Sequence, residues 1–577
     1  MPEMYTIGAR WAVLNLGILR VKIMMRRALK ICLVAVPAIA GPYLYAKTQV
    51  PEKLRPENTL QRYIQSPEPI SSPLHFANVN YDKSSHVSCY QYTLTSQVWP
   101  KQAVSQSGAQ WAHTLKIYRP DTVAHDTALL FVSGGTRNPI DGGHNPPPAT
   151  LDFSSMANLT HSIIVVLQDV PNQYLTFDDG IQRKEDSIVA YTWRRFLEAP
   201  EQGDSWPVHL PMTKAIIKAM DAAQNVALNE WKINLNHFVV AGASKRGWAT
   251  WLSALADNRV SAIVPVVIDI LNTQENIRHI YRSYGCAWPP AFRDYEAEKI
   301  TSHIETPEFE KLMHIEDPLI YLQGSQGEHY KKRLSIPKYI ISASGDDFFV
   351  PDSSTLYLDT LPGETRTRVI PNQSHYIDMK IVGKAILGWY QSILTGTERP
   401  NISWEHNTDK SVVVFTEGKP THVKLWQATN PKNCDFRYNA GIRYESRLLQ
   451  DKEKCDDKNH CRYSVDIGTT PETGCRASFV EATFIDQLGG EMVVTTPVLV
   501  QKSTSIADLQ TSCVLPGEKL SNQVPATNSC DDNESNTTGN NFRSIFRNSF
   551  FSCSSIRDNP SSAEITTDQK KSHYNFR

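Results

Sequence analysis

One segment constrains the fold of this chain more than any other. Phe238 to Trp248 reads FVVAGASKRGW, an apolar, β-branched run that enters a Gly-x-Ser turn and continues into residues compatible with a helix. A strand that turns sharply at a serine into a helix exposes the hydroxyl at the top of a sheet. The turn strains the backbone of the serine, so the preceding residues must be small, as Gly242 and Ala243 are. The segment therefore predicts Ser244 as a nucleophile.

Arg246 is the unusual residue of this turn. It stands two residues after the serine, where glycine is the common choice, and Gly247 comes one later. A guanidinium in the first turn of the following helix can bind a substrate carboxylate through two parallel hydrogen bonds. It can equally pair with an acid of the scaffold. The sequence leaves both alternatives for Arg246 open.

A serine hydroxyl needs a neighbouring base, and strand–elbow–helix enzymes of the α/β-hydrolase fold carry serine, acid and histidine in that chain order. Lys338–Ala343 reads as a buried strand that leads into an acidic turn at Asp346 and Asp347. A second short strand begins near Thr367 and is followed by a loop that carries His375. Residues directly after parallel strands point into the cleft where such sheets bind ligands. The pattern predicts a triad of Ser244, Asp346 and His375.

Two adjacent carboxylates compete for the role of the acid. Asp346 lies nearer the end of the strand and is the preferred candidate, with Asp347 as the alternative acid. If Asp346 is the triad acid, we expect Asp347 to cap the helix that Pro351–Ser354 begins.

Two backbone N–H groups are expected to hold the oxyanion. One belongs to the residue after the nucleophile, Lys245, and the other to the loop after an earlier strand. Leu129–Val132 is that strand, and the glycines that follow it let the backbone approach a substrate oxygen closely. The second donor is therefore assigned to Gly135 or Thr136.

The pattern of strands and helices predicts the organisation of the chain. A domain over about 50–400 alternates apolar strands with helical segments, which is typical of a mostly parallel, doubly wound sheet. Within it, residues of about 272–337 read as a helical lid insert, and its Trp288 either contacts substrate or packs the insert on the core. Short alternating strands over 401–502 predict a small β-sandwich. The polar stretch over 503–577 reads as disordered.

The N-terminal residues 1–46 predict export. A basic stretch, Met24–Lys30, precedes a short apolar segment with A-x-A-like cleavage sites, and translation can start at Met24 or Met25. The apolar segment is short for a bilayer span. The alternatives are a cleaved signal peptide and an uncleaved membrane anchor. The protein is thus expected in the periplasm or outside the cell, either free or anchored to the inner membrane.

The cysteines and the net charge indicate which cross-links, metal sites and ligands to expect. Of ten cysteines, Cys434, Cys455, Cys461 and Cys475 cluster late in the chain and predict disulfides, with three pairings open. No Cys-x-x-Cys pair occurs, so the sequence predicts neither a zinc site nor any other metal or cofactor. A net charge of −1 gives no electrostatic case for nucleic-acid binding.

Beyond these patterns, the chain resembles the PhoPQ-activated pathogenicity-related protein family, a group of exported α/β-hydrolase-like proteins. The resemblance runs from about residue 50 to 500. It rests on the serine elbow with its Lys-Arg-Gly-Trp tail and on Leu167–Gln173, Arg183–Asp186, Ala190–Trp193, Leu210–Ala215, Ala219–Asp221, Asp269–Asn272, Tyr284–Gly285, Trp288–Pro289, Gly345–Phe349, Pro351–Ser354 and Pro371–Asn372 before His375. The resemblance makes Arg246 a feature of the family. It also implies an exported, serine-hydrolase-like protein that is linked to virulence in some members, and it names no substrate.

Two functions follow as alternatives. The first is a serine hydrolase that cleaves an ester or amide bond in a small-molecule or peptide substrate. The second is a secreted binding or signalling protein on a hydrolase scaffold that has lost its activity. The complete set of serine, acid and histidine favours the first, because a scaffold without activity need not keep all three. The C-terminal domain is in either case a candidate site for a protein partner.

Overall fold

The computed structural model describes residues 59–70, 73–100, 110–137, 151–408, 410–449, 454–457 and 460–517. The predicted signal peptide or anchor over residues 1–46 and the end of the predicted tail lie outside these ranges. Within them, every helix is too short or too polar to span a bilayer.

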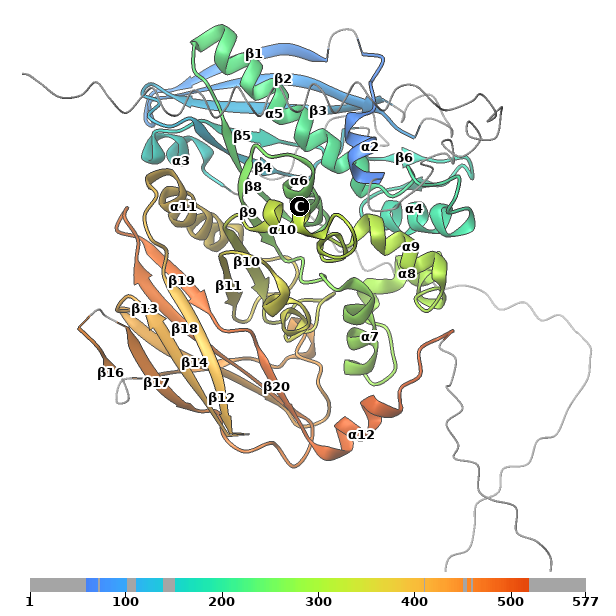
Figure 1. Cartoon of the computed structure of the whole chain (residues 1–577), viewed down its shortest axis with the longest axis vertical. Coiled ribbons are helices and arrows are strands. Elements are labelled where there is room, and N and C mark those ends of the chain that lie inside the picture. The colour runs from blue at the N-terminus through green and yellow to red at the C-terminus, as the bar shows by residue number, and fades with distance from the viewer. Residues whose placement is uncertain are drawn as a thin grey trace, which may run out of the picture. The chain divides into compact units, whose positions relative to one another are not determined.

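Nine strands form one mixed sheet, in the order β1-β2-β3-β5-β4-β8-β9-β10-β11 (Figure 1). In this order, β5, β4, β8, β9, β10 and β11 pair parallel with their neighbours. The strands β1, β2, β3 and β5 pair antiparallel. The strand bounds are β1 Leu74–Asp82, β2 Val87–Val98, β3 Gln110–Pro120, β4 Thr127–Val132, β5 Ile164–Leu167, β8 His237–Ala243, β9 Val260–Val266, β10 Lys338–Ala343 and β11 Thr365–Ile370.

Helices cover both faces of this sheet because its central strands carry apolar side chains on both faces. Leu130 and Val240 point into one buried cluster, and their neighbours Leu129 and Val239 point into another. The first cluster includes residues of α5 (His209–Trp231) and α6 (Lys245–Ala256), and the second includes α3 (Phe153–Thr160) and α11 (Met379–Thr395). Such continuous apolar runs are typical of parallel strands that are buried on both sides. The predicted fold class, a doubly wound α/β-hydrolase sheet, is confirmed.

The segment between β9 and β10, where the sequence predicts an insert, is helical. It contains α7 (Thr273–Ser283), α8 (Arg293–Ala297), α9 (Pro307–Glu316) and α10 (Gly327–Leu334). Trp288 lies between α7 and α8, where its ring stacks on Phe292 with centroids 5.5 Å apart. Of the two alternatives for Trp288, this contact favours packing within the insert.

Two small antiparallel sheets follow, in the orders β12-β13-β17-β16 and β15-β14-β18-β19, with β20 paired to β18. Val414 and Tyr463 of the first sheet share one buried cluster with Leu425 and Val480 of the second, so the sheets pack as a sandwich. The strand bounds are β12 Asn401–Thr408, β13 Ser411–Glu417, β14 His422–Asn430, β15 Glu445–Leu448, β16 Lys454–Cys455, β17 Cys461–Asp466, β18 Cys475–Ile485, β19 Glu491–Thr495 and β20 Leu499–Lys502.

The predicted disordered tail begins too early at residue 503. Residues Thr504–Ser512 form α12, and Cys513 directly after it is bonded to Cys286 of the insert. The polar composition of this stretch does not indicate that it is ordered. A covalent link to a distant segment holds the helix, which has no hydrophobic core of its own.

Three disulfides cross-link the described residues. Cys434–Cys475 and Cys455–Cys461 decide between the three pairings that the sequence leaves open, and Cys286–Cys513 is a further bond that the sequence did not predict. Cys89 is free. Disulfides of this number are typical of oxidising compartments and indicate a location outside the cytosol.

The Cys286–Cys513 bond should contribute strongly to stability because it joins residues 227 positions apart. Replacing both cysteines with serine should lower the free energy of unfolding by about 2–5 kcal/mol. Urea unfolding under non-reducing conditions measures this, with Cys89→Ser as the control that should change little. Equal stability of the double variant and the parent would contradict the bond.

Candidate active site

The elbow between β8 and α6 holds Ser244 in a strained backbone conformation, with φ 58° and ψ −130°. A residue other than glycine rarely adopts a positive φ, and such strain is common at active sites. A Cβ atom on Gly242 would lie 2.7 Å from the carbonyl oxygen of Arg246, and one on Gly247 would lie 2.7 Å from Cγ2 of Ile268. The turn therefore requires glycine at both positions, and Gly247 takes the place of the usual second glycine.

The three residues of the predicted triad come together at this elbow. Nε2 of His375 lies 2.9 Å from Oγ of Ser244, and Nδ1 lies 3.1 and 3.0 Å from the two carboxylate oxygens of Asp346. The Asp346 carboxylate is buried and also accepts a hydrogen bond of 2.8 Å from the backbone N–H of Phe348. A carboxylate at Nδ1 favours the tautomer with a proton there, which leaves Nε2 free to accept the serine proton.

Asp347 lies beside this triad in a different environment. Burial and the charge of Asp346 raise the pKa of the Asp347 carboxyl. The expected capping role of Asp347 is wrong: the short 3₁₀ helix Ser353–Leu356 has Asp352 at its N-cap, and the Asp352 carboxylate is 2.8 Å from Nε2 of His279. The reason is that the helix begins only at Ser353, so the bends and turn of residues 347–352 separate Asp347 from its N-terminus.

The predicted oxyanion donors lie at the ends of adjacent strands. β4 pairs with β8, with Val132 opposite Gly242, so the loop with Gly135 and Thr136 starts beside the elbow. Gly135 has φ 142°, and a Cβ atom there would lie 2.2 Å from Oδ1 of Asp169. Lys245 is the first residue of α6, where backbone N–H groups lack partners within the helix.

Arg246 and Lys245 both bind Glu185, an acid that the sequence analysis did not single out. The Arg246 guanidinium pairs with one carboxylate oxygen, and Nζ of Lys245 lies 2.7 Å from the other. Nε of Arg246 also donates to the carbonyl oxygen of Val170 at 2.6 Å. Although burial acts in the opposite direction, these two cations hold the pKa of Glu185 well below its usual range. The contacts favour the scaffold alternative for Arg246.

Gln173 connects this ion cluster to the candidate oxyanion loop. Its Nε2 donates to the carbonyl oxygen of Gly135 at 2.9 Å and to Oε1 of Glu185 at 2.8 Å. Its Oε1 accepts a hydrogen bond of 2.9 Å from the backbone N–H of Glu185. One side chain thereby couples the loop after β4 to the residues that hold the elbow.

A cavity of about 50 Å³ opens beside Ser244 and His375. Its lining is almost entirely apolar, and the insert supplies much of it, including Ile277, Phe292 and Tyr295. Neither Arg246 nor Trp288 is among the lining residues. Their predicted contacts with substrate therefore find no support in the geometry.

One polar pair lies in the wall of this cavity. Nδ1 of His209 is 2.9 Å from Oε2 of Glu316, and both side chains are fully buried. Nε1 of Trp193 donates to Oε1 of Glu316 at 2.8 Å, and the His209 ring stacks on Trp248 with centroids 4.6 Å apart. The pair fixes the two tryptophans that shape the cavity.

Sequence reasoning missed Glu185, His209 and Glu316. Glu185 lies in the Arg-Lys-Glu-Asp segment that carries the family resemblance, so that segment held a signal. His209 and Glu316 stand in helices far apart in the chain, and no spacing links them.

Within the described ranges, no group of three or more His, Cys, Asp or Glu side chains is arranged to hold a metal ion.

The Arg246–Glu185 pair should couple energetically. Arg246→Met and Glu185→Gln should each lower the free energy of unfolding, and the double variant should recover about 0.5–3 kcal/mol relative to their sum. The Glu185 side chain is 32% exposed, so solvent screening keeps the coupling below that of a fully buried pair. Urea unfolding of the four proteins measures the coupling, and strictly additive effects would contradict it.

Comparison with known proteins places the chain in a family. A model of the PhoPQ-activated pathogenicity-related protein family matches residues 60–437. Autocrine proliferation repressor protein A of Dictyostelium discoideum is 32% identical over 417 residues, which cover 69% of this chain and 80% of that protein.

Solved structures of esterases are more distant. An acetyl xylan esterase from Paenibacillus is 12% identical with a TM-score of 0.38, and the alignment covers 60% of this chain and 96% of the esterase. Acetyl xylan esterase 1 from Thermoanaerobacterium is 14% identical with a TM-score of 0.36, over 58% of this chain and 93% of the esterase. The family match spans well over half of the chain, and the chain therefore belongs to the PhoPQ-activated pathogenicity-related protein family.

Proposed function

We propose that this protein is an exported serine hydrolase that cleaves an ester or amide bond. The observation that carries the proposal is the position of His375, whose two ring nitrogens lie within hydrogen-bonding distance of Ser244 and Asp346. The strained backbone of Ser244 is a second support, since such strain persists only where the surroundings impose it.

The reaction follows from the positions of these groups. Oγ of Ser244 attacks the substrate carbonyl carbon while Nε2 of His375 takes the hydroxyl proton. Asp346 holds the ring orientation and stabilises the imidazolium that forms. The backbone N–H groups of Lys245 and of Gly135 or Thr136 stabilise the oxyanion. His375 then returns the proton to the leaving alcohol or amine. In the second half of the reaction, a water molecule gives a proton to His375 and attacks the acyl carbon, and the bond to Oγ of Ser244 breaks as Oγ takes that proton back.

The cavity limits the substrate class. A volume of about 50 Å³ lies far below the roughly 300–1,000 Å³ of pockets that enclose drug-sized ligands. Most of its surface is apolar, and its two charged lining residues, Asp186 and Lys245, already pair with each other at 3.2 Å, so the part of the substrate that enters should be short and uncharged. The leaving group is not constrained by this cavity, so esters and amides both remain candidates.

A binding or signalling function is the second candidate. The relative from Dictyostelium discoideum is named for repressing proliferation, which is a regulatory role and not a chemical reaction. A secreted regulator could keep the hydrolase scaffold without activity. The reactivity of Ser244 distinguishes the two candidates, because only the hydrolase requires a reactive serine.

Location follows from the disulfides together with the N-terminal sequence. Three disulfides fit a protein that folds outside the cytosol. The predicted signal peptide or anchor over residues 1–46 directs the chain to the periplasm or the cell exterior.

Ser244 should react covalently with a fluorophosphonate probe. A serine activated by His375 attacks the phosphorus, and Ser244→Ala should abolish labelling because the nucleophile is gone. Mass spectrometry of the labelled peptide identifies the site, and the melting temperature shows that the variant is folded. Folded parent protein that never reacts would favour the regulatory candidate.

Asp346 and Asp347 should differ sharply in their effect on this reaction. Asp346→Asn removes the carboxylate at Nδ1 of His375 and should slow turnover by about 10⁴-fold, because the imidazole loses its tautomer preference. Asp347→Asn is the matched control and should have a far smaller effect. Rates of labelling or ester hydrolysis over pH 5–9 measure both, and an Asp346→Asn variant as active as the parent would move the acid assignment to Asp347 or elsewhere.

A further inference from the structure

The loop that carries His375 lies at the edge of the large sheet. It follows β11, the last strand, which has a neighbouring strand of this sheet on one side only. The loop is tied to the acidic turn by two bonds: the backbone N–H of Asn372 donates to Oγ of Ser344 at 2.9 Å, and that of Gly345 donates to the carbonyl oxygen of Gln373 at 3.0 Å. A third element that contacts either loop therefore acts on the position of both.

A segment of the C-terminal domain supplies this third element. We call residues Cys434–Tyr444 the clamp loop. The backbone N–H of Tyr438 donates to the carbonyl oxygen of Gly345 at 2.9 Å. Nδ2 of Asn372 donates to the carbonyl oxygen of Tyr444 at 2.9 Å, and the N–H of Tyr444 donates to Oδ1 of Asn372 at 2.8 Å. The clamp loop thus binds the residue before Asp346 and a residue three positions before His375.

The clamp loop lies so close to the acidic turn and the histidine loop that only some residue types fit at the contact. A Cβ atom on Gly345 would lie 2.9 Å from the backbone nitrogen of Tyr438 and 3.0 Å from the carbonyl oxygen of Gln373. Both atoms belong to backbone and cannot rotate away. Asn372 has φ 57°, the left-handed conformation that asparagine tolerates better than most residues. Glycine and asparagine at these positions fit a contact that is built between the two domains.

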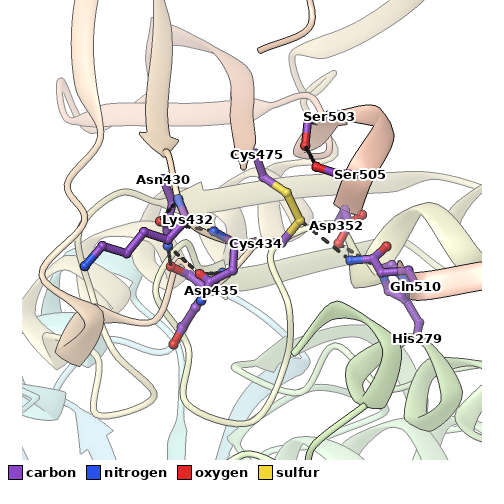
Figure 2. Close-up of a disulfide and its surroundings, with 11 residues drawn as sticks. His279, Asp352, Asn430, Lys432, Cys434, Asp435, Cys475, Ser503, Ser505 and Gln510 are labelled. Carbon is purple, nitrogen blue, oxygen red and sulfur yellow. Dashed lines mark hydrogen bonds and ion pairs between the residues drawn. A yellow bond between two sulfur atoms is a disulfide. The ribbon is translucent and has the colours of Figure 1, made fainter. Parts of the chain in front are cut away.

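The clamp loop is itself held in place. Figure 2 shows the Cys434–Cys475 disulfide at its start, beside Gln510 of α12, whose Nε2 lies 3.6 Å from Sγ of Cys434. Nδ2 of Asn430 donates to Oδ1 of Asn433 at 2.7 Å and to the carbonyl oxygen of Asp435 at 2.8 Å, which fixes the turn out of β14. The start of the clamp loop is therefore anchored by a disulfide and by side-chain hydrogen bonds.

The same loop reaches the insert that lines the cavity. The guanidinium carbon of Arg437 lies 4.7 Å from the ring centroid of Tyr284, the residue directly after α7. Asp435 holds the guanidinium through two hydrogen bonds. Three parts of the site, the acidic turn, the histidine loop and the insert, thus contact one loop of the C-terminal domain.

We propose that the clamp loop positions Asp346 and His375 against Ser244, so that the C-terminal domain completes the active site. The Asn372 side chain and the backbone groups of Tyr438 and Tyr444 have a positioning role, because they touch neither Ser244 nor the imidazole and act through the two loops. This inference rests on the proposed serine-hydrolase function. A displacement of about 1 Å in a reacting group can cost about 100-fold in rate, so small changes at the clamp loop should be measurable.

The first test removes the side-chain pair at Asn372. Asn372→Gly keeps the left-handed backbone accessible and deletes both hydrogen bonds to Tyr444. The rate constant for fluorophosphonate labelling of Ser244 should fall by about 10- to 100-fold in folded protein. The matched control is Gln427→Ala, which deletes an amide that makes two hydrogen bonds within the sandwich, to Ile467 and Ser478. An unchanged rate in folded Asn372→Gly protein would overturn the proposal.

The second test replaces one backbone donor. Tyr438 is the first residue of a short 3₁₀ helix, and Arg437 before it has φ −55° and ψ 145°, so proline is tolerated there. Tyr438→Pro removes the N–H that binds Gly345 and puts a ring carbon in its place, which should slow labelling to a similar degree. Tyr438→Ala keeps the N–H and should label at the parent rate. Equal rates for the proline and alanine variants would count against the clamp loop.

A third measurement separates this inference from the hydrolase proposal. An imidazole N–H shared with a carboxylate gives a strongly downfield proton resonance in NMR, which reports the His375–Asp346 bond without any reaction. Should folded parent protein not label, the hydrolase proposal fails, and this resonance alone decides about the clamp loop. Loss of the resonance in Asn372→Gly, with the parent signal present, supports positioning. A resonance that is retained in the variant, or absent from the parent, overturns it.

Discussion

Ser244 is held with φ 58° and ψ −130°, and much of the surrounding structure serves to keep it there. Such a conformation costs about 1–3 kcal/mol for a residue with a side chain. Gly242 and Gly247 let the strand and the helix approach closely enough to make the turn, and Glu185 binds the two cations that follow the serine. The strain is thus offset by contacts of the elbow itself and by an ion cluster with Glu185, which directly precedes the helix Asp186–Glu198.

The groups around the serine come from four separate regions that converge on the ends of parallel strands. The loop after β4 is joined to the elbow through Gln173 and Glu185. The loops after β10 and β11 carry the acid and the histidine, and the insert between β9 and β10 supplies the apolar wall of the cavity. Each region is anchored by a strand end or by a buried polar contact.

With the proposed role of the clamp loop, the site depends on the C-terminal domain, although that domain supplies no reacting group. If the clamp loop positions His375, the catalytic domain alone should lose activity when it is cut away, even though it retains every reacting group. The Cys434–Cys475 bond lies at the base of that loop, so the proposed role would couple oxidative folding to assembly of the site.

The sequence by itself determined the fold class, the family and the three residues that meet at the elbow. These features rest on local patterns: apolar runs that mark strands buried on both faces, a small-residue turn at Ser244, and residues that directly follow strands. Only the tertiary structure decided the partner of Arg246, the order of residues 504–512, the Cys286–Cys513 bond and the contacts of Asn372 with Tyr444. The physical reason is range, since periodicity and turn chemistry encode contacts between near neighbours, whereas these contacts join residues tens to hundreds of positions apart and depend on how the elements pack.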